Sequence, residues 1–326
     1  MKKIFLFAAA AMVSLSSCVQ TEEVYTGSVS EMGFKSAVTR AVINSTSDLV
    51  LPIAVSSVLD NTEDATENYV PYFSGAKFVY DEGTELWRGE PARYWPNSGH
   101  MYFLGFCPYP TTATLVTNYD ASTGKIQNVV ASGIDNNILN QHDILYSDLL
   151  SVDAPQTAAQ PLLFHHAQAQ LNVTFKKTDS QAVVVLNSVL LEGVFLSGNL
   201  TITPVEGGQS VAEWTTPGEA FTKNRFFNKD LTVSGVEVSE LGATLTATEA
   251  YSPLPLMVVP GAQKKMLITY TVDGHQQVYE LDLTTSGEKW EMGHKYTYNF
   301  TINVNEIIFD CTVENWIPVD GGNITI

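Results

Sequence analysis

Short runs rich in Val, Ile, Tyr, Phe and Thr recur along the chain and predict β-strands. The clearest run alternates apolar and polar residues through Tyr296, Tyr298 and Phe300, which is the period of a strand with one buried face. The runs that we expect to be strands are 32–38, 49–55, 75–80, 100–106, 170–175, 182–191, 194–202, 243–247, 255–260, 265–272, 277–283, 295–302 and 306–313.

Turn and helix signals complete this picture. Asp273-Gly274 separates two of the runs and is typical of a tight hairpin turn. The best helical candidate is short, at 135–150, where Ile138, Leu145 and Leu149 recur at helical spacing. Many short strands divided by Gly, Pro, Asn and Asp favour an all-β fold built from β-sandwiches over one long barrel.

The length and one polar stretch indicate how the chain divides. The chain has 326 residues, which at roughly 100–200 residues per domain implies two domains. Residues 151–161 are small and polar and include Pro155 and Pro161, and strand-like runs resume after them. We therefore place the boundary between residues 160 and 161.

The N-terminus has the features of an export signal. Two lysines precede a short apolar run, Ile4–Val13, which is about half of the ~20 residues that a membrane-spanning helix needs. Leu15-Ser16-Ser17-Cys18 then resembles the lipobox of bacterial lipoproteins, in which the peptidase cuts before a Cys that carries the lipid. We expect residues 1–17 to be a signal peptide and Cys18 to be lipidated; an ordinary signal peptide is the alternative.

The charge and the cysteines narrow the function classes. The chain has 17 Lys+Arg against 35 Asp+Glu, a formal net charge of −18, and lacks the basic clusters that bind nucleic acid. Loss of residues 1–17 removes Lys2 and Lys3 and leaves 15 − 35 = −20. Cys107 and Cys311 lie in apolar runs and are expected to be small buried residues. An inter-domain disulfide between them is the alternative.

Candidate chemistry is sparse. The sequence lacks the phosphate-binding, zinc-protease, serine-hydrolase and Cys-pair motifs, so we expect no cofactor and no metal. His165 and His166 are adjacent and point to opposite faces of a strand, which disfavours a metal site. The aromatic residues Trp87, Tyr94 and Trp95 fit two interpretations, the core of the first domain or a platform that stacks on sugar rings.

A series of short motifs spans nearly the whole chain. In order they are Cys18, Thr39-Arg40-Ala41, Tyr94-Trp95-Pro96, Met101–Pro110, Asp143–Ser147, Leu163–Leu171, Pro255–Pro260, Met292–Tyr298 and Val313–Trp316. Together they resemble the fimbrillin family, the Mfa-like subunits of type V pili.

The resemblance implies two tandem transthyretin-like Greek-key β-sandwiches, at 41–160 and 161–326, behind a lipidated propeptide at 18–40 that carries a cleavable first strand. It implies a structural and adhesive protein, not an enzyme. The precursor would be lipid-anchored at the outer membrane and the mature protein would lie at the cell surface, in a fimbrium. An Arg-specific surface protease would cut between Arg40 and Ala41.

Assembly would then proceed by donor-strand exchange, in which a strand from one subunit fills the groove that the cleaved strand leaves in another. The candidate donor is the C-terminal segment, whose apolar residues are Ile317, Val319, Ile324 and Ile326. Pro318 and the pair Gly321-Gly322 would interrupt a long ladder in this segment.

The implied partners are other fimbrillin subunits, the protease, the lipoprotein-processing machinery and a host or bacterial surface receptor. A surface-anchored glycan-binding lipoprotein, with Trp87, Tyr94 and Trp95 as contacts, is the alternative function.

Overall fold

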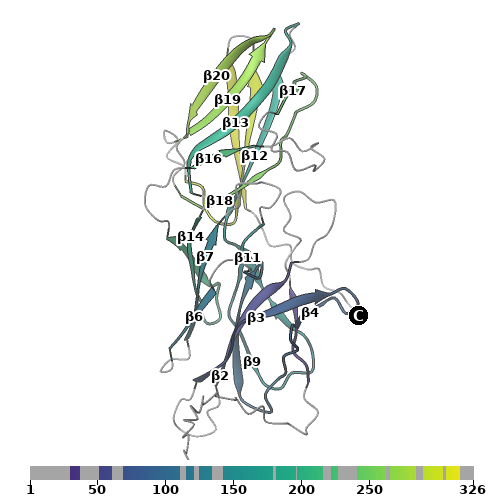
Figure 1. Cartoon of the computed structure of the whole chain (residues 1–326), viewed down its shortest axis with the longest axis vertical. Helices are drawn as coiled ribbons and strands as arrows, with labels where there is room; N and C mark the ends of the chain where they lie inside the picture. The colour runs from purple at the N-terminus through teal and green to yellow at the C-terminus, as the bar shows by residue number, and fades with distance from the viewer. Residues whose placement is uncertain are drawn as a thin grey trace, which may run out of the picture.

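The computed structural model describes residues 30–36, 51–60, 69–110, 115–120, 125–133, 142–178, 181–195, 197–215, 222–226, 241–261, 265–283, 289–303 and 306–315. Within these ranges the chain is all β, and no helix occurs, so none could span a membrane. The molecule is elongated, with the N-terminal strands at one end of its long axis and β13, β19 and β20 at the other (Figure 1).

The first sheet holds nine strands in the order β10-β1-β4-β3-β2-β5-β8-β11, with β9 paired to β5. These strands are β1 (Gly33–Ser36), β2 (Ile53–Asp60), β3 (Tyr69–Asp81), β4 (Leu86–Gly89), β5 (His100–Cys107), β8 (Leu145–Ser147), β9 (Leu150–Asp153), β10 (Gln160–Leu162) and β11 (Phe164–His166). The two end strands, β10 and β11, are separated in the chain by Leu163 alone. The sheet therefore folds over on itself, and strands from both ends enclose one core that includes Phe34, Phe78, Trp95 and Phe103.

A second sheet covers the outer face of the first. Its order is β15 (Val211–Thr215), β14 (Ser197–Thr203), β7 (Lys125–Gly133) and β6 (Leu115–Asp120). Leu200, Ile202 and Ala212 of this sheet pack against Ala54, Leu104 and Phe106 of the first sheet. Because β14 pairs with β7, this sheet unites segments from both sides of residue 160.

The remaining strands form a sandwich at the other end of the molecule. One layer has the order β18 (Leu256–Val258), β12 (Ala169–Lys177), β21 (His294–Ile302) and β22 (Ile307–Asn315), and β12 and β21 run parallel. The other layer has the order β16 (Thr222–Arg225), β13 (Val184–Val194), β19 (Lys265–Val272) and β20 (His275–Asp282), with β17 (Ala243–Thr244) on β13. The core between the layers includes the stacked rings of Phe175 and Phe300, whose centroids are 4.9 Å apart.

A short connection, Ala167-Gln168, joins the two ends of the molecule and is hydrogen-bonded to residues of both. The Ala167 carbonyl accepts a hydrogen bond from Trp214 Nε1 at 2.5 Å, and the Gln168 carbonyl accepts one from the Gly293 N–H at 2.9 Å. The Gln168 side chain accepts another from the Ile144 N–H at 3.0 Å. Beside it, His166 Nδ1 lies 2.5 Å from a carboxylate oxygen of Asp143, and both side chains are buried. Burial raises the pKa of the Asp143 carboxyl, and the contact with His166 offsets part of that rise.

Most of the expected strands are confirmed, and so is the hairpin at Asp273-Gly274, where both residues have positive φ and Val272 pairs with His275. The expected helix at 135–150 is wrong in its described part, because residues 145–147 form β8 and residue 150 begins β9. Nine described strands lie outside the runs that the sequence predicts: β4, β6, β7, β8, β9, β10, β11, β15 and β16. The polar stretch 151–161 lies inside the first sheet, since it contains most of β9 and the start of β10. The division into two domains at residue 160 stays a prediction.

Candidate functional site

Strand β1 occupies a slot between two other strands of the first sheet. It runs parallel to β10, where Phe34 is opposite Gln160, and antiparallel to β4, where Phe34 is opposite Trp87. This short segment is therefore an internal strand of the sheet, although it lies far from both neighbours in sequence.

The side chains of β1 and of the residue before it close the core at this point. Met32 and Phe34 are both 0 % exposed. The Phe34 ring contacts Phe78 and Phe103 edge-on, with centroid distances of 5.0 and 5.3 Å. Burial of an apolar side chain of this size is worth roughly 1.5–3 kcal/mol, so these two residues provide most of the hydrophobic energy that retains β1. Between them Gly33 is buried against Leu86 and Ala159.

The residues that lead into β1 are also hydrogen-bonded. The Met32 N–H donates to the Arg93 carbonyl at 2.7 Å, and the Trp95 N–H donates to the Ser30 carbonyl at 3.1 Å. The Ser30 hydroxyl donates to the Gln156 carbonyl at 2.8 Å. The slot therefore extends beyond β1 itself and holds the segment from residue 30 onwards.

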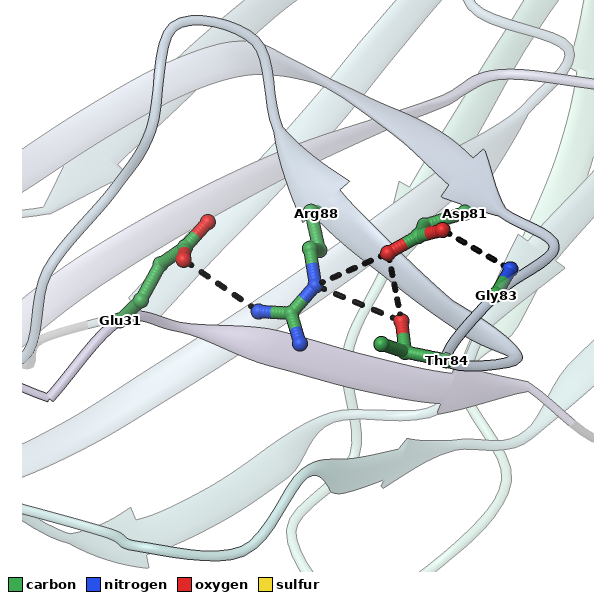
Figure 2. Close-up of polar contacts among 5 residues, drawn as sticks. All are labelled: Glu31, Asp81, Gly83, Thr84 and Arg88. Carbon is green, nitrogen blue, oxygen red and sulfur yellow. Dashed lines mark hydrogen bonds and ion pairs between the residues drawn. The ribbon is translucent and has the colours of Figure 1, made fainter.

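An ion pair lies at the entrance of the slot. Arg88 Nη1 on β4 donates to a Glu31 carboxylate oxygen at 3.3 Å (Figure 2). On its other side Arg88 Nε lies 3.5 Å from an Asp81 carboxylate oxygen and 3.4 Å from the Thr84 hydroxyl. The Thr84 hydroxyl and the Gly83 N–H donate to Asp81, and these two hydrogen bonds lower the pKa of its carboxyl. We call Arg88, Asp81 and Thr84 the Arg88 clamp.

The three candidate glycan contacts differ in burial: Trp87 and Trp95 are buried, whereas Tyr94 is exposed. Trp87 and Trp95 are 5 % and 2 % exposed and belong to the core that also holds Phe34. A buried ring has no face on which a sugar could stack, so for these two residues the glycan interpretation is wrong and the core interpretation holds. Tyr94 is 48 % exposed and stands alone among the three. Trp87 is instead part of the slot, because it is opposite Phe34 on β4.

Other predicted site residues lie outside the described ranges. They are Cys18, Arg40, Ala41, Ile317, Val319, Ile324 and Ile326. Neither Cys107 nor Cys311 is in a disulfide; Cys107 is buried in the core of the first sheet and Cys311 is partly buried on β22.

One further cluster has the order of contacts found in serine hydrolases. His100 Nδ1 lies 2.7 Å from Asp153, and His100 Nε2 lies 2.6 Å from the Ser151 hydroxyl. In hydrolases the carboxylate of such a triad is buried, whereas the Asp153 side chain is 88 % exposed. The register places His100 directly opposite Asp153 on neighbouring strands, so the cluster is accounted for as a cross-strand surface contact.

Comparison with known proteins identifies the class. The model of the fimbrillin-like family matches residues 39–316, and the chain belongs to that family. A comparison with curated protein sequences finds no match. Among solved structures, a fimbrial protein from Bacteroides vulgatus has a TM-score of 0.58 at 14 % identity, covering 88 % of this chain and 99 % of its own.

Two candidate cell adhesion proteins also share the fold. The one from Bacteroides ovatus has a TM-score of 0.54 at 15 % identity and covers 89 % of this chain and 99 % of its own. The one from Bacteroides uniformis has a TM-score of 0.52 at 16 % identity and covers 88 % of this chain and 99 % of its own. At these identities the likeness establishes a shared fold, and the family membership establishes a fimbrial or adhesive subunit at the cell surface.

Proposed function

We propose that this protein is a pilus subunit that polymerises by exchange of β1 for a strand of a neighbouring subunit. Export as a lipoprotein modified at Cys18 precedes this step, and an Arg-specific protease cuts between Arg40 and Ala41. The observation that carries the proposal is the position of β1, an internal strand that ends at Ser36, four residues before Arg40 in the sequence.

The physical consequence of losing β1 supports an exchange. Departure of this strand would leave unpaired backbone groups along both β4 and β10 and would open the pockets of Met32 and Phe34. An exposed strand slot of this kind is a ready template for another chain. A donor strand that pairs with the backbone groups and fills both pockets restores the hydrogen bonds and the apolar burial that β1 provided.

The C-terminal segment is the donor in this scheme. It directly follows β22, which is an edge strand among the described residues and pairs with β21. Four apolar residues, Ile317, Val319, Ile324 and Ile326, offer side chains for the pockets. Association costs an estimated 4–15 kcal/mol, so more than one of them has to be buried.

Processing is tested by N-terminal sequencing of surface material. The wild-type chain should begin at Ala41 and contain 326 − 40 = 286 residues. Arg40→Ala should give an uncut chain that folds but does not form SDS-resistant ladders. Lys35→Ala is the matched control: it removes the nearest upstream basic residue, which lies in β1 opposite Pro161, and should leave the cut unchanged. Normal ladders from the Arg40→Ala variant would refute the proposal.

The donor is tested separately by deletion of residues 323–326. The truncated chain should mature and keep its melting temperature but lose its ladders. Unchanged ladders would show that this segment is not the donor. A lowered melting temperature would show that it belongs to its own domain.

A further inference from the structure

The entrance of the β1 slot holds a cation in a fixed place. Arg88 projects from β4 at the register position of Gly33, and its guanidinium reaches the residue just before the first buried side chain, Met32. That residue is Glu31, which lies two positions before β1 and accepts a hydrogen bond from Arg88 Nη1 through its carboxylate (Figure 2). The position of the charge is thus linked to the register of the occupying strand.

The Arg88 clamp does not depend on β1 for its own geometry. Asp81 and Thr84 hold Arg88 Nε; Asp81 is the last residue of β3, and Thr84 lies in the turn between β3 and β4. The Thr84 hydroxyl donates to Asp81 at 2.8 Å, and the Gly83 N–H does so at 2.9 Å. Removal of β1 would therefore leave Nη1 directed at the vacated position of Glu31.

We propose that Arg88 selects the strand that enters the slot, favouring one with Asp or Glu immediately before an apolar-small-apolar sequence. This inference rests on the proposed strand exchange. Met32-Gly33-Phe34 shows the pattern in the present occupant: two apolar residues fill the pockets, and the residue between them lies against Leu86 and Ala159. The acidic residue before this sequence, Glu31, sets the register, because its carboxylate pairs with the Arg88 guanidinium.

The chain's own C-terminal segment matches this pattern incompletely. Ile324-Thr325-Ile326 has the apolar spacing, but the residue before it is Asn323, which can accept a hydrogen bond from Arg88 and carries no charge. A partner strand with a carboxylate at that position would therefore be preferred over the tail of a second copy. Arg88 thereby biases the slot toward a different subunit.

The experiment uses the full chain, with residues 37–40 replaced by the site of a sequence-specific protease. After the cut, labelled peptides with the sequence of residues 28–38 compete for the slot, and bound label is measured by size exclusion. The peptides carry Glu, Gln or Lys at position 31. The protein is tested as wild type, Arg88→Gln and Arg88→Glu.

On the wild type, the Gln peptide should bind about two- to fivefold more weakly than the Glu peptide, the range typical of exposed ion pairs, and the Lys peptide more weakly still. The preference should fade at 1 M salt. Arg88→Gln should bind the Glu and Gln peptides alike, and Arg88→Glu should bind the Lys peptide best. Lys77→Gln is the matched control, since it removes the separate Lys77–Glu90 pair on exposed side chains and should keep the wild-type order.

Equal binding of the three peptides to the wild type would overturn the selectivity and leave strand exchange intact. Persistence of the preference in Arg88→Gln would also overturn it. Failure of every peptide to enter the slot would overturn strand exchange itself, and the selectivity with it.

Discussion

Phe34 shows at the scale of one residue how a four-residue strand can be held firmly. Its side chain is fully buried and contacts two other phenylalanines edge-on, Phe78 and Phe103. Such aromatic contacts add about 0.5–1.5 kcal/mol to the burial of area. The next residue, Lys35, points away from the core and is exposed.

Phe34→Ala in the uncut chain should lower the free energy of unfolding by up to about 3–5 kcal/mol, the usual range for a buried Phe. The loss is limited by the free energy of detaching β1 alone, because a strand at the N-terminal end can leave without global unfolding. Urea denaturation would measure the free energy of unfolding, and amide exchange at β4 would measure the free energy of detaching β1. Lys35→Ala should change neither, and a stable Phe34→Ala chain with protected β4 amides would contradict the assigned role of this ring.

The two cysteines of the described chain should differ in reactivity. Cys107 is 4 % exposed, and burial strongly raises the pKa of its thiol, so almost none of it is the reactive thiolate at neutral pH. Cys311 lies on the edge strand β22 and is only partly buried. Iodoacetamide on the native protein should therefore modify Cys311 first, and Cys107 only after denaturation, as peptide mass mapping would show. Equal labelling rates would contradict the burial of Cys107.

Closure of the first sheet depends, at the scale of elements, on a close approach of β5, β8 and β11. A side chain added at Gly105 would place Cβ 2.8 Å from the Phe164 ring and 3.2 Å from the Ser147 hydroxyl. That hydroxyl accepts the Gly105 N–H at 2.6 Å. Only glycine therefore lets β11 pack this close to β5.

Gly105→Ala should destabilise the protein by about 1–3 kcal/mol, because either Phe164 or the strand has to move. Gly33→Ala is a matched control, since Gly33 is also a buried strand glycine but its added Cβ would meet Leu86 at 3.5 Å and Ala159 at 3.8 Å, ordinary contacts. The midpoint of urea denaturation should be clearly lower for Gly105→Ala than for Gly33→Ala. A Gly105→Ala protein as stable as Gly33→Ala would show that the Phe164 contact can relax freely.

The whole molecule is expected to behave as one mechanical unit. The hairpin β14–β15 pairs with β7, and its Leu200 and Ile202 pack against the first sheet. The connection at Ala167 and Gln168 is hydrogen-bonded to Trp214 and Gly293. A subunit of a fibre has to transmit force along its length, and these contacts join its two ends without a loose linker.

Calorimetry of the wild type should therefore give a single transition. Leu200→Ala removes a fully buried side chain from the cluster that Leu200 and Ile202 form with the first sheet. It should lower the free energy of unfolding by about 2–5 kcal/mol, and the two ends of the molecule should then melt separately. Val211→Ala in the same hairpin is the control, because Val211 is 48 % exposed and should have little effect. Two transitions in the wild type would show that the ends unfold independently.

The sequence determined the local features of this protein. Alternation such as Tyr296, Tyr298 and Phe300 fixes a strand and its buried face, since a strand repeats every two residues whatever its neighbours are. Asp273-Gly274 fixes a hairpin, because both residues accept positive φ. The family resemblance, now confirmed by the match over residues 39–316, also came from short motifs in order.

Only the tertiary structure decided which strands are neighbours. Nothing in a four-residue segment such as Gly33–Ser36 shows that it lies between β4 and β10, since that pairing joins residues more than fifty positions apart. The same holds for β14 on β7, which crosses the expected domain boundary, and for the burial of Trp87 and Trp95. The contact of Glu31 with Arg88 has no sequence signal at all, because an exposed ion pair needs only two charges brought together by the fold. Strand identity is local and can be read from side-chain period, whereas strand order follows from burial of the whole chain.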